Sequence, residues 1–122
     1  MTMTNVLRAA AICATLLTAQ SAFAWGCKIE DAGRKAAEPD HPLQSRVNLY
    51  VGEVGVWGDL RVRTSQLQAN EWVEVDVKGP QFTKHLRLVP NKPESLEVCG
   101  KDILITANGV GNGSATIIVS AF

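Results

Sequence analysis

Apolar and polar residues alternate with a period of two over most of the chain beyond residue 44. Val47, Leu49 and Val51 alternate with Asn48 and Tyr50. Because successive side chains of a strand point to opposite faces, this alternation predicts a strand with one buried face. Apolar residues recur at strand spacing in further stretches: residues 60–65, 73–77, 82–88, 96–98, 103–105 and 116–119.

Clusters of glycine, proline and asparagine separate these stretches at intervals of about 8 to 12 residues, which is typical of a β-sandwich or a small barrel. Residues 103–105 are apolar on both faces and predict a strand inside a sheet. Glycines interrupt residues 52–58 and predict a bulge or tight bend. We therefore predict an all-β fold for residues 44–122. Its form is a small antiparallel sandwich (immunoglobulin-like) or small barrel of about seven strands.

Residues 25–43 lack this alternation. Residues 30–38 could form a short helix, but Gly33 interrupts it. Pro39 and Pro42 then bar regular structure. The sequence predicts an N-terminal arm and loop ahead of the β domain.

Residues 1–24 have the three parts of a secretory signal peptide. Arg8 supplies the positive charge, residues 9–19 form an apolar run, and a small-x-small triplet ends at Ala24. The run is shorter than the about 20 apolar residues of a transmembrane helix, and no later segment is apolar enough to span. We predict cleavage after Ala24 and a periplasmic or secreted product.

A lipoprotein signal, cut directly before Cys27, is the alternative. Gly26 suits such a signal, whereas Trp25 does not, and Ala24 stands where a larger aliphatic residue is usual. Lipidation would also leave Cys99 without a partner in an oxidising compartment. The residues favour cleavage after Ala24.

Two cysteines remain once Cys13 is removed with the signal segment. Cys27 and Cys99 then allow a single intramolecular pairing. Cys99 is expected on the strand that Leu96 and Val98 begin. Their spacing matches no zinc motif. A bridge across a loop this long would stabilise the fold by about 4 kcal/mol on the chain-entropy model, so we predict a structural disulfide.

A hairpin centred on Gly79-Pro80 would bring an acid, a histidine, an aromatic ring and an arginine onto one face. The predicted pairs are Val77 with Phe82, Val73 with Leu86, Glu74 with His85, and Trp72 with Arg87. Such pairing keeps the apolar pairs on one face and the polar pairs on the other. The polar pairs would be an ion pair and a cation–π contact. Lys84 breaks the apolar face and indicates a sheet edge.

Tryptophan and arginine are enriched among residues that dominate binding energy in interfaces. Trp57, Trp72 and Arg87 are therefore the candidate protein-binding residues. The alternative for Trp72 and Arg87 is cross-strand stabilisation on a solvated face. The alternative for Trp57 is that it caps one end of the core.

No catalytic motif, metal-ligand spacing or cofactor motif is present, and His41 lies between prolines in a loop. The chain carries 12 Lys+Arg and 12 Asp+Glu, which disfavours nucleic acid or an anionic membrane as partner. We expect a non-enzymatic protein-binding module of the bacterial periplasm or cell surface, an inhibitor or assembly factor, whose partner is another exported or envelope protein. The alternatives are a structural subunit of a surface fibre and a small hydrolase using His85 or His41.

Overall fold

Two antiparallel sheets containing nine strands make up residues 27–121, the part of the chain that this computed structural model describes. In chain order the strands are β1 (Ile29–Lys35), β2 (Val47–Tyr50), β3 (Val54–Gly58), β4 (Leu60–Gln68), β5 (Trp72–Gly79), β6 (Phe82–Leu88), β7 (Glu94–Val98), β8 (Lys101–Val110) and β9 (Ser114–Ala121). Within this range no helix is long and apolar enough to cross a membrane. The predicted signal segment and its cleavage point lie outside the described residues.

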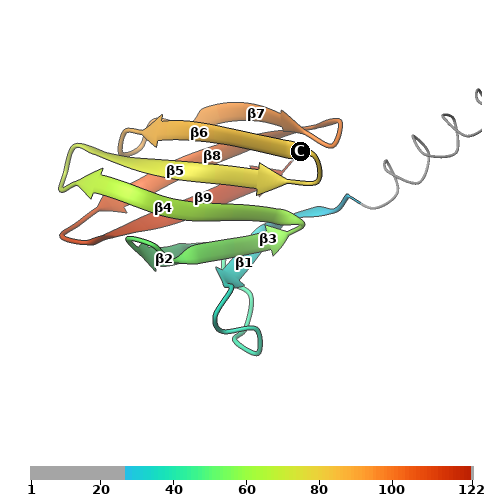
Figure 1. The fold of residues 1–122 in the computed structure, drawn as a ribbon, viewed down its shortest axis with the longest axis horizontal. Helices are drawn as coiled ribbons and strands as arrows, with labels where there is room; N and C mark the ends of the chain where they lie inside the picture. Colours follow the sequence, from blue (N-terminus) through green and yellow to red (C-terminus); the bar gives the residue numbers. More distant parts are fainter. Residues whose placement is uncertain (1–26, 122) are drawn as a thin grey trace, which may run out of the picture.

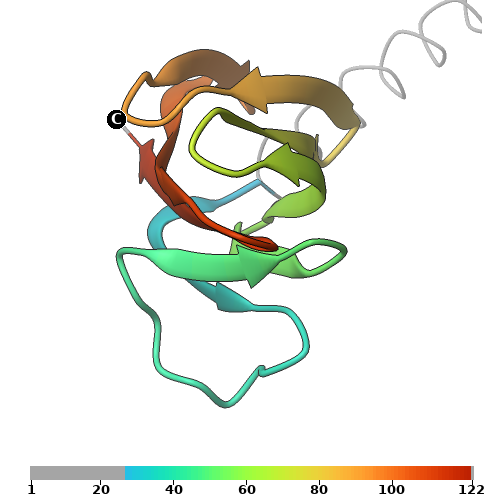
Figure 2. The ribbon, with the colours of Figure 1, turned by 90° about the vertical axis from the view of Figure 1, so that its left-hand side faces the viewer.

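The two sheets pack face to face as a sandwich (Figures 1 and 2). The five-stranded sheet has the order β1-β3-β4-β5-β6, and the four-stranded sheet has the order β2-β9-β8-β7. Strands β3 to β6 are hydrogen-bonded in sequence order, whereas the chain changes sheet around β2 and between β6 and β7. The predicted all-β antiparallel sandwich is confirmed.

The core lies between the sheets and is built from the inward side chains of both. The alternation in β4 is an example, because Leu60 and Val62 are fully buried while Arg61 and Arg63 are exposed. Burying one large apolar side chain contributes about 1.5–3 kcal/mol. The largest fully buried side chains are Trp57, Leu49, Leu60, Leu88, Ile103, Ile105 and Ile117.

Two predictions about strand position are confirmed. Residues 103–105 lie in β8, which is hydrogen-bonded to β9 on one side and to β7 on the other. Lys84 lies in β6, the last strand of the five-stranded sheet. An exposed lysine on an edge strand disfavours the addition of a further strand from another molecule.

Strands β1 and β3 are the two that the sequence did not predict. Residues 29–35 were expected to belong to an arm or short helix, and this expectation is wrong. Residues 52–58 were expected to form a bulge or bend; Gly52 and Gly58 do have positive φ values of 90° and 63°, but Val54–Gly58 is a strand. Two of the glycines that suggested interruption have a packing role. Gly33 and Gly55 lie against the indole of Trp57, where a side chain would collide with the ring.

Trp57 is fully buried on the inner side of β3. A β-carbon on Gly33 would lie 2.6 Å from its Nε1, and one on Gly55 would lie 2.6 Å from its Cζ3. Both distances are too short for a real contact, so the indole fits only because these positions have no side chain. The full burial of Trp57 contradicts its predicted role as a protein-binding residue, and of the two predictions the one that packs its ring against the core is closer to its position.

The disulfide between Cys27 and Cys99 is confirmed, with a Cα–Cα distance of 6.0 Å. It joins Cys27, two residues ahead of β1, to the turn between β7 and β8. Cys99 was expected on a strand, but it has a φ of 56° and is followed by Gly100 with a φ of 73°. Two successive positive φ values are typical of the tight turns that join antiparallel strands. The bridge uses the Cys27 sulfur that lipidation would modify.

The β5–β6 hairpin has a register two residues away from the predicted one. Glu74 pairs with Arg87 and Asp76 pairs with His85. The error arises at the turn, which is formed by Pro80 and Gln81 and not by Gly79 and Pro80; Gln81 has a φ of 53°. Because the slip is an even number of residues, every side chain keeps its predicted face.

Candidate functional site

Polar side chains of β4, β5 and β6 meet on the outer face of the five-stranded sheet. In β5, Glu74 and Asp76 alternate with the fully buried Val73, Val75 and Val77. The alternation that builds the core therefore also turns the acidic side chains of β5 toward the same outer surface. We call Gln66, Glu74, Asp76, His85 and Arg87 the polar network.

Glu74 is the centre of the polar network. Its Oε1 accepts hydrogen bonds from Arg87, at 2.7 Å from Nη2 and 3.3 Å from Nε. Its Oε2 lies 3.0 Å from Nε2 of Gln66 and 2.8 Å from Nε2 of His85. The side chain is 12% exposed, against 58% for Arg87 and 53% for His85. Hydrogen bonds from Arg87, then from Gln66 and His85, lower the pKa of Glu74 to about 2.

His85 lies between two carboxylates. Its Nδ1 is 2.7 Å from Oδ1 of Asp76, and its Nε2 is 2.8 Å from Oε2 of Glu74. These two contacts, the one with Asp76 first, raise the pKa of the imidazole above its ordinary value. In the charged form both ring nitrogens donate to carboxylates. A histidine held this way has no free nitrogen to take a proton from a nucleophile.

Arg87 also covers the ring of Trp72. Its guanidinium carbon lies 4.3 Å from the ring centroid, which is a close cation–π contact. The contact is diagonal, because Arg87 pairs with Glu74 in the sheet. The predicted Trp72–Arg87 and Glu74–His85 contacts are thus both present, although neither pair is directly opposite. Arg87 therefore contacts both the ring of Trp72 and the carboxylate of Glu74.

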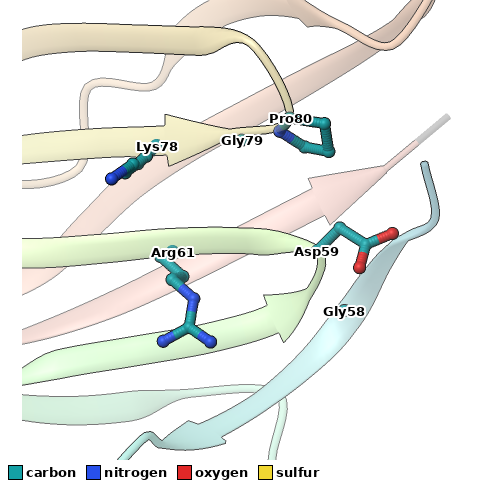
Figure 3. A pocket seen from close by; sticks show the side chains of 6 residues that line it. All are labelled: Gly58, Asp59, Arg61, Lys78, Gly79 and Pro80. Atoms are coloured by element: carbon teal, nitrogen blue, oxygen red, sulfur yellow. The ribbon is translucent and has the colours of Figure 1, made fainter. Parts of the chain in front are cut away.

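A hollow of about 440 Å³ opens on the same face, near the β3–β4 and β5–β6 turns (Figure 3). It is lined by Gly58, Asp59, Arg61, Lys78, Gly79 and Pro80. Arg61 and Lys78 are directly opposite each other in the β4–β5 pairing. The sequence did not predict this pair, because a bulge between Thr64 and Gln66 shifts the register of β4 against β5. Only the alternation of Arg61 with buried neighbours signalled that it points outward.

The three predicted binding residues do not lie together. Trp72 and Arg87 are in contact on the outer face, whereas Trp57 is in the core. His41 lies in the loop between β1 and β2, which projects from one side of the sandwich (Figure 2), and its ring contacts Gln44 and the carbonyl of Pro42. Among residues 27–121 no three histidine, cysteine or acidic side chains are grouped so that they could hold a metal ion.

Comparison of the chain with protein-family models, with curated proteins and with solved structures gives no significant match.

Proposed function

We propose that this chain is a non-enzymatic protein-binding module of the bacterial periplasm or cell surface, acting as an inhibitor or assembly factor. Its binding surface is the outer face of β4, β5 and β6, around Trp72 and Arg87. The observation that carries the proposal is the double role of Arg87, which lies over Trp72 and bonds Glu74 at 2.7 Å.

A surface held in one geometry loses little conformational entropy when a partner binds, and this favours affinity. Arg87 is half-exposed yet tied to two neighbours, and His85 is tied to two carboxylates. Rigid aromatic and arginine side chains are the types that dominate interface energies. The alternative remains cross-strand stabilisation alone, which predicts no effect of these residues on binding.

The state of His85 supports a binding role over hydrolysis. Its two ring nitrogens contact Asp76 and Glu74, and no hydroxyl of residues 27–121 is hydrogen-bonded to it. A histidine that activates a serine or threonine needs such a hydroxyl within reach. The disulfide supports the exported location, because such bridges persist in oxidising compartments.

A surface-fibre subunit remains the second hypothesis, and one of the four edge strands, β6, argues against it. Lys84 is exposed on edge strand β6, where it disfavours pairing with a strand of another molecule. Assembly by strand exchange predicts high-mass species in size-exclusion chromatography of the oxidised protein. A single monomer peak is the expected result.

The test begins with affinity capture from envelope extract, using oxidised residues 25–122 as bait, and ends with affinities for the purified partner. Trp72→Ala and Arg87→Ala should each weaken binding by about fivefold or more, which corresponds to the 1 kcal/mol that separates binding residues from neutral contacts. Lys101→Ala is the control, because Lys101 is an exposed lysine of the other sheet. Unchanged affinity in folded Trp72→Ala and Arg87→Ala would refute the proposed surface.

A further inference from the structure

Three cations lie in one line across the outer face of the five-stranded sheet, with Val56 between the first two. In the strand pairing, Arg34 of β1 is opposite Val56 of β3, Val56 is opposite Arg61 of β4, and Arg61 is opposite Lys78 of β5. Neighbouring strands lie about 4.8 Å apart, so the side chains of Arg61 and Lys78 start close together. We call Arg34, Arg61 and Lys78 the cationic row.

No ion pair among residues 27–121 includes a member of this row. Arg34 donates from Nη1 to the carbonyls of Pro39 and His41, which are uncharged. Like charges directly opposite each other in a sheet are destabilising. The fold therefore keeps Arg61 and Lys78 opposite each other although neither forms an ion pair with an acid of residues 27–121.

The acids on the outer face of β5 and at the hollow are engaged elsewhere. Glu74 is bonded to Arg87 and His85, and Asp76 to His85. Asp59 lines the hollow, but its Oδ2 accepts a hydrogen bond of 2.6 Å from the backbone N–H of Lys28. Figure 3 shows its carboxylate on the opposite side of the hollow from the charged ends of Arg61 and Lys78.

The surface along the row is concave. The hollow of about 440 Å³ beside Arg61 and Lys78 has a neighbour of about 240 Å³ that Arg34, Val56 and Arg61 line. Arg61 contributes to both hollows. An extended ligand could therefore follow the row from β5 to β1 with its anionic groups beside each cation.

We propose that the cationic row binds an acidic polypeptide segment of the partner, whose aspartate or glutamate carboxylates contact Arg61 and Lys78. The inference rests on the proposed function and names the chemistry of the partner. A guanidinium forms two parallel hydrogen bonds with one carboxylate, which gives such a contact both strength and direction.

The balance of acidic and basic residues favours a protein segment over a long polyanion as the ligand of the cationic row. The chain has as many acidic as basic residues, whereas binding to nucleic acid or an anionic membrane relies on a broad basic surface. On this face the row is followed by Asp76 and Glu74 in β5. A uniformly charged polymer extending along β5 would meet those carboxylates, while a protein segment can present acids at one end and other side chains toward Trp72.

The probe is a fluorescein-labelled synthetic peptide of alternating glutamate and serine, with a glutamine and serine peptide as its neutral counterpart. Fluorescence anisotropy with the oxidised mature protein measures the affinity. The double variant Arg61→Gln/Lys78→Gln should bind the acidic peptide about tenfold more weakly, as expected when charge-assisted hydrogen bonds are lost. Lys92→Gln/Lys101→Gln removes the same charge at exposed sites elsewhere and should bind like the wild type.

Equal weakening in both double variants would overturn the inference, because it would mean an effect of overall charge. Tighter, row-dependent binding of a sulfated oligosaccharide or of anionic phospholipid vesicles would also overturn it. The purified partner then separates the two proposals. If Trp72→Ala weakens partner binding and Arg61→Gln/Lys78→Gln does not, the binding surface stands and the acidic segment is refuted. If neither change has an effect, both are refuted.

Discussion

Gly33 and Trp57 fit together because Gly33 has no side chain. An added β-carbon would lie 2.6 Å from Nε1 and 2.7 Å from Cε2 of the indole, and 2.7 Å from the backbone carbonyl of Val56. Gly33 of β1 thus packs against the indole that β3 contributes to the core. This contact also explains why a glycine stands inside a strand, where it costs backbone entropy and contributes no packing.

Gly33→Ala should lower the free energy of unfolding by about 1–3 kcal/mol, the usual cost of forcing an extra methyl group into a packed site. Urea denaturation of the oxidised protein measures the change. Gly109→Ala is the matched control, because a β-carbon there meets no atom within 4 Å and its φ lies outside the positive range. Equal stability of the two variants would contradict the close contact.

The alternation of apolar and polar residues could not predict this contact. Alternation alone predicted β4 and β5, because their buried valines and leucines repeat every second residue. It did not predict β1 and β3, whose inward positions include Gly33 and Gly55. A glycine that makes room for a large ring has the same local signature as a glycine that ends a strand. Only the distant Trp57 distinguishes the two, and it is known only after folding.

The stability of the fold should depend on pH through Glu74 and His85. The pKa of Glu74 falls from an ordinary 4.5 to about 2, so its contribution is complete above pH 4.5 and is lost as the pH falls toward 2. The pKa of His85 is raised above an ordinary 6.5, so its contribution is complete below pH 6.5 and is lost as the pH rises through the raised value. Both contributions are complete only between these two ordinary values.

Urea midpoints measured across this range should therefore decrease on both sides of the window. His85→Gln keeps a side chain of similar size without the titration, so its midpoints should no longer decrease on the alkaline side. Acid sensitivity should persist in this variant because Arg87 and Gln66 still bond Glu74. If the urea midpoint of His85→Gln still decreases on the alkaline side as in the wild type, a group other than His85 causes that decrease.

The polar network shows which parts of the site the sequence could predict. Strand parity placed Glu74, His85, Trp72 and Arg87 on one face, and a register error of two residues did not alter this. Asp76 as the second partner of His85 required the true register, which Pro80 and Gln81 set through the turn. The opposition of Arg61 and Lys78 depended on a bulge in β4 that no local pattern announces.

Reduction of the Cys27–Cys99 bridge should destabilise the protein. The bridge closes a loop with a sequence separation of 72 residues, and loss of a bridge of this kind typically costs about 2–4 kcal/mol. The native oxidised protein should resist thiol-specific labelling, and both cysteines should become labelled after reduction. The Cys27→Ser/Cys99→Ser variant should match the reduced wild type in urea denaturation. Prompt labelling of both cysteines in the native protein would contradict the bridge.

Removing one cation of the Arg61–Lys78 pair should make the fold more stable. The two residues are directly opposite and have no acidic partner in the described chain, so each raises the free energy of the folded state through the other. Lys78→Gln should increase the free energy of unfolding by up to about 1 kcal/mol, the scale of a cross-strand pair. The increase should shrink at high salt, where the repulsion is screened. Lys92→Gln removes an exposed lysine in the loop between β6 and β7 and should leave stability unchanged.

If Lys78→Gln makes the fold more stable and also weakens binding of the acidic peptide, then the two like charges of Arg61 and Lys78 destabilise the fold but are needed for binding. A loss of stability in Lys78→Gln would instead reveal a favourable contact of Lys78 within the fold and remove the reason to seek an anion there.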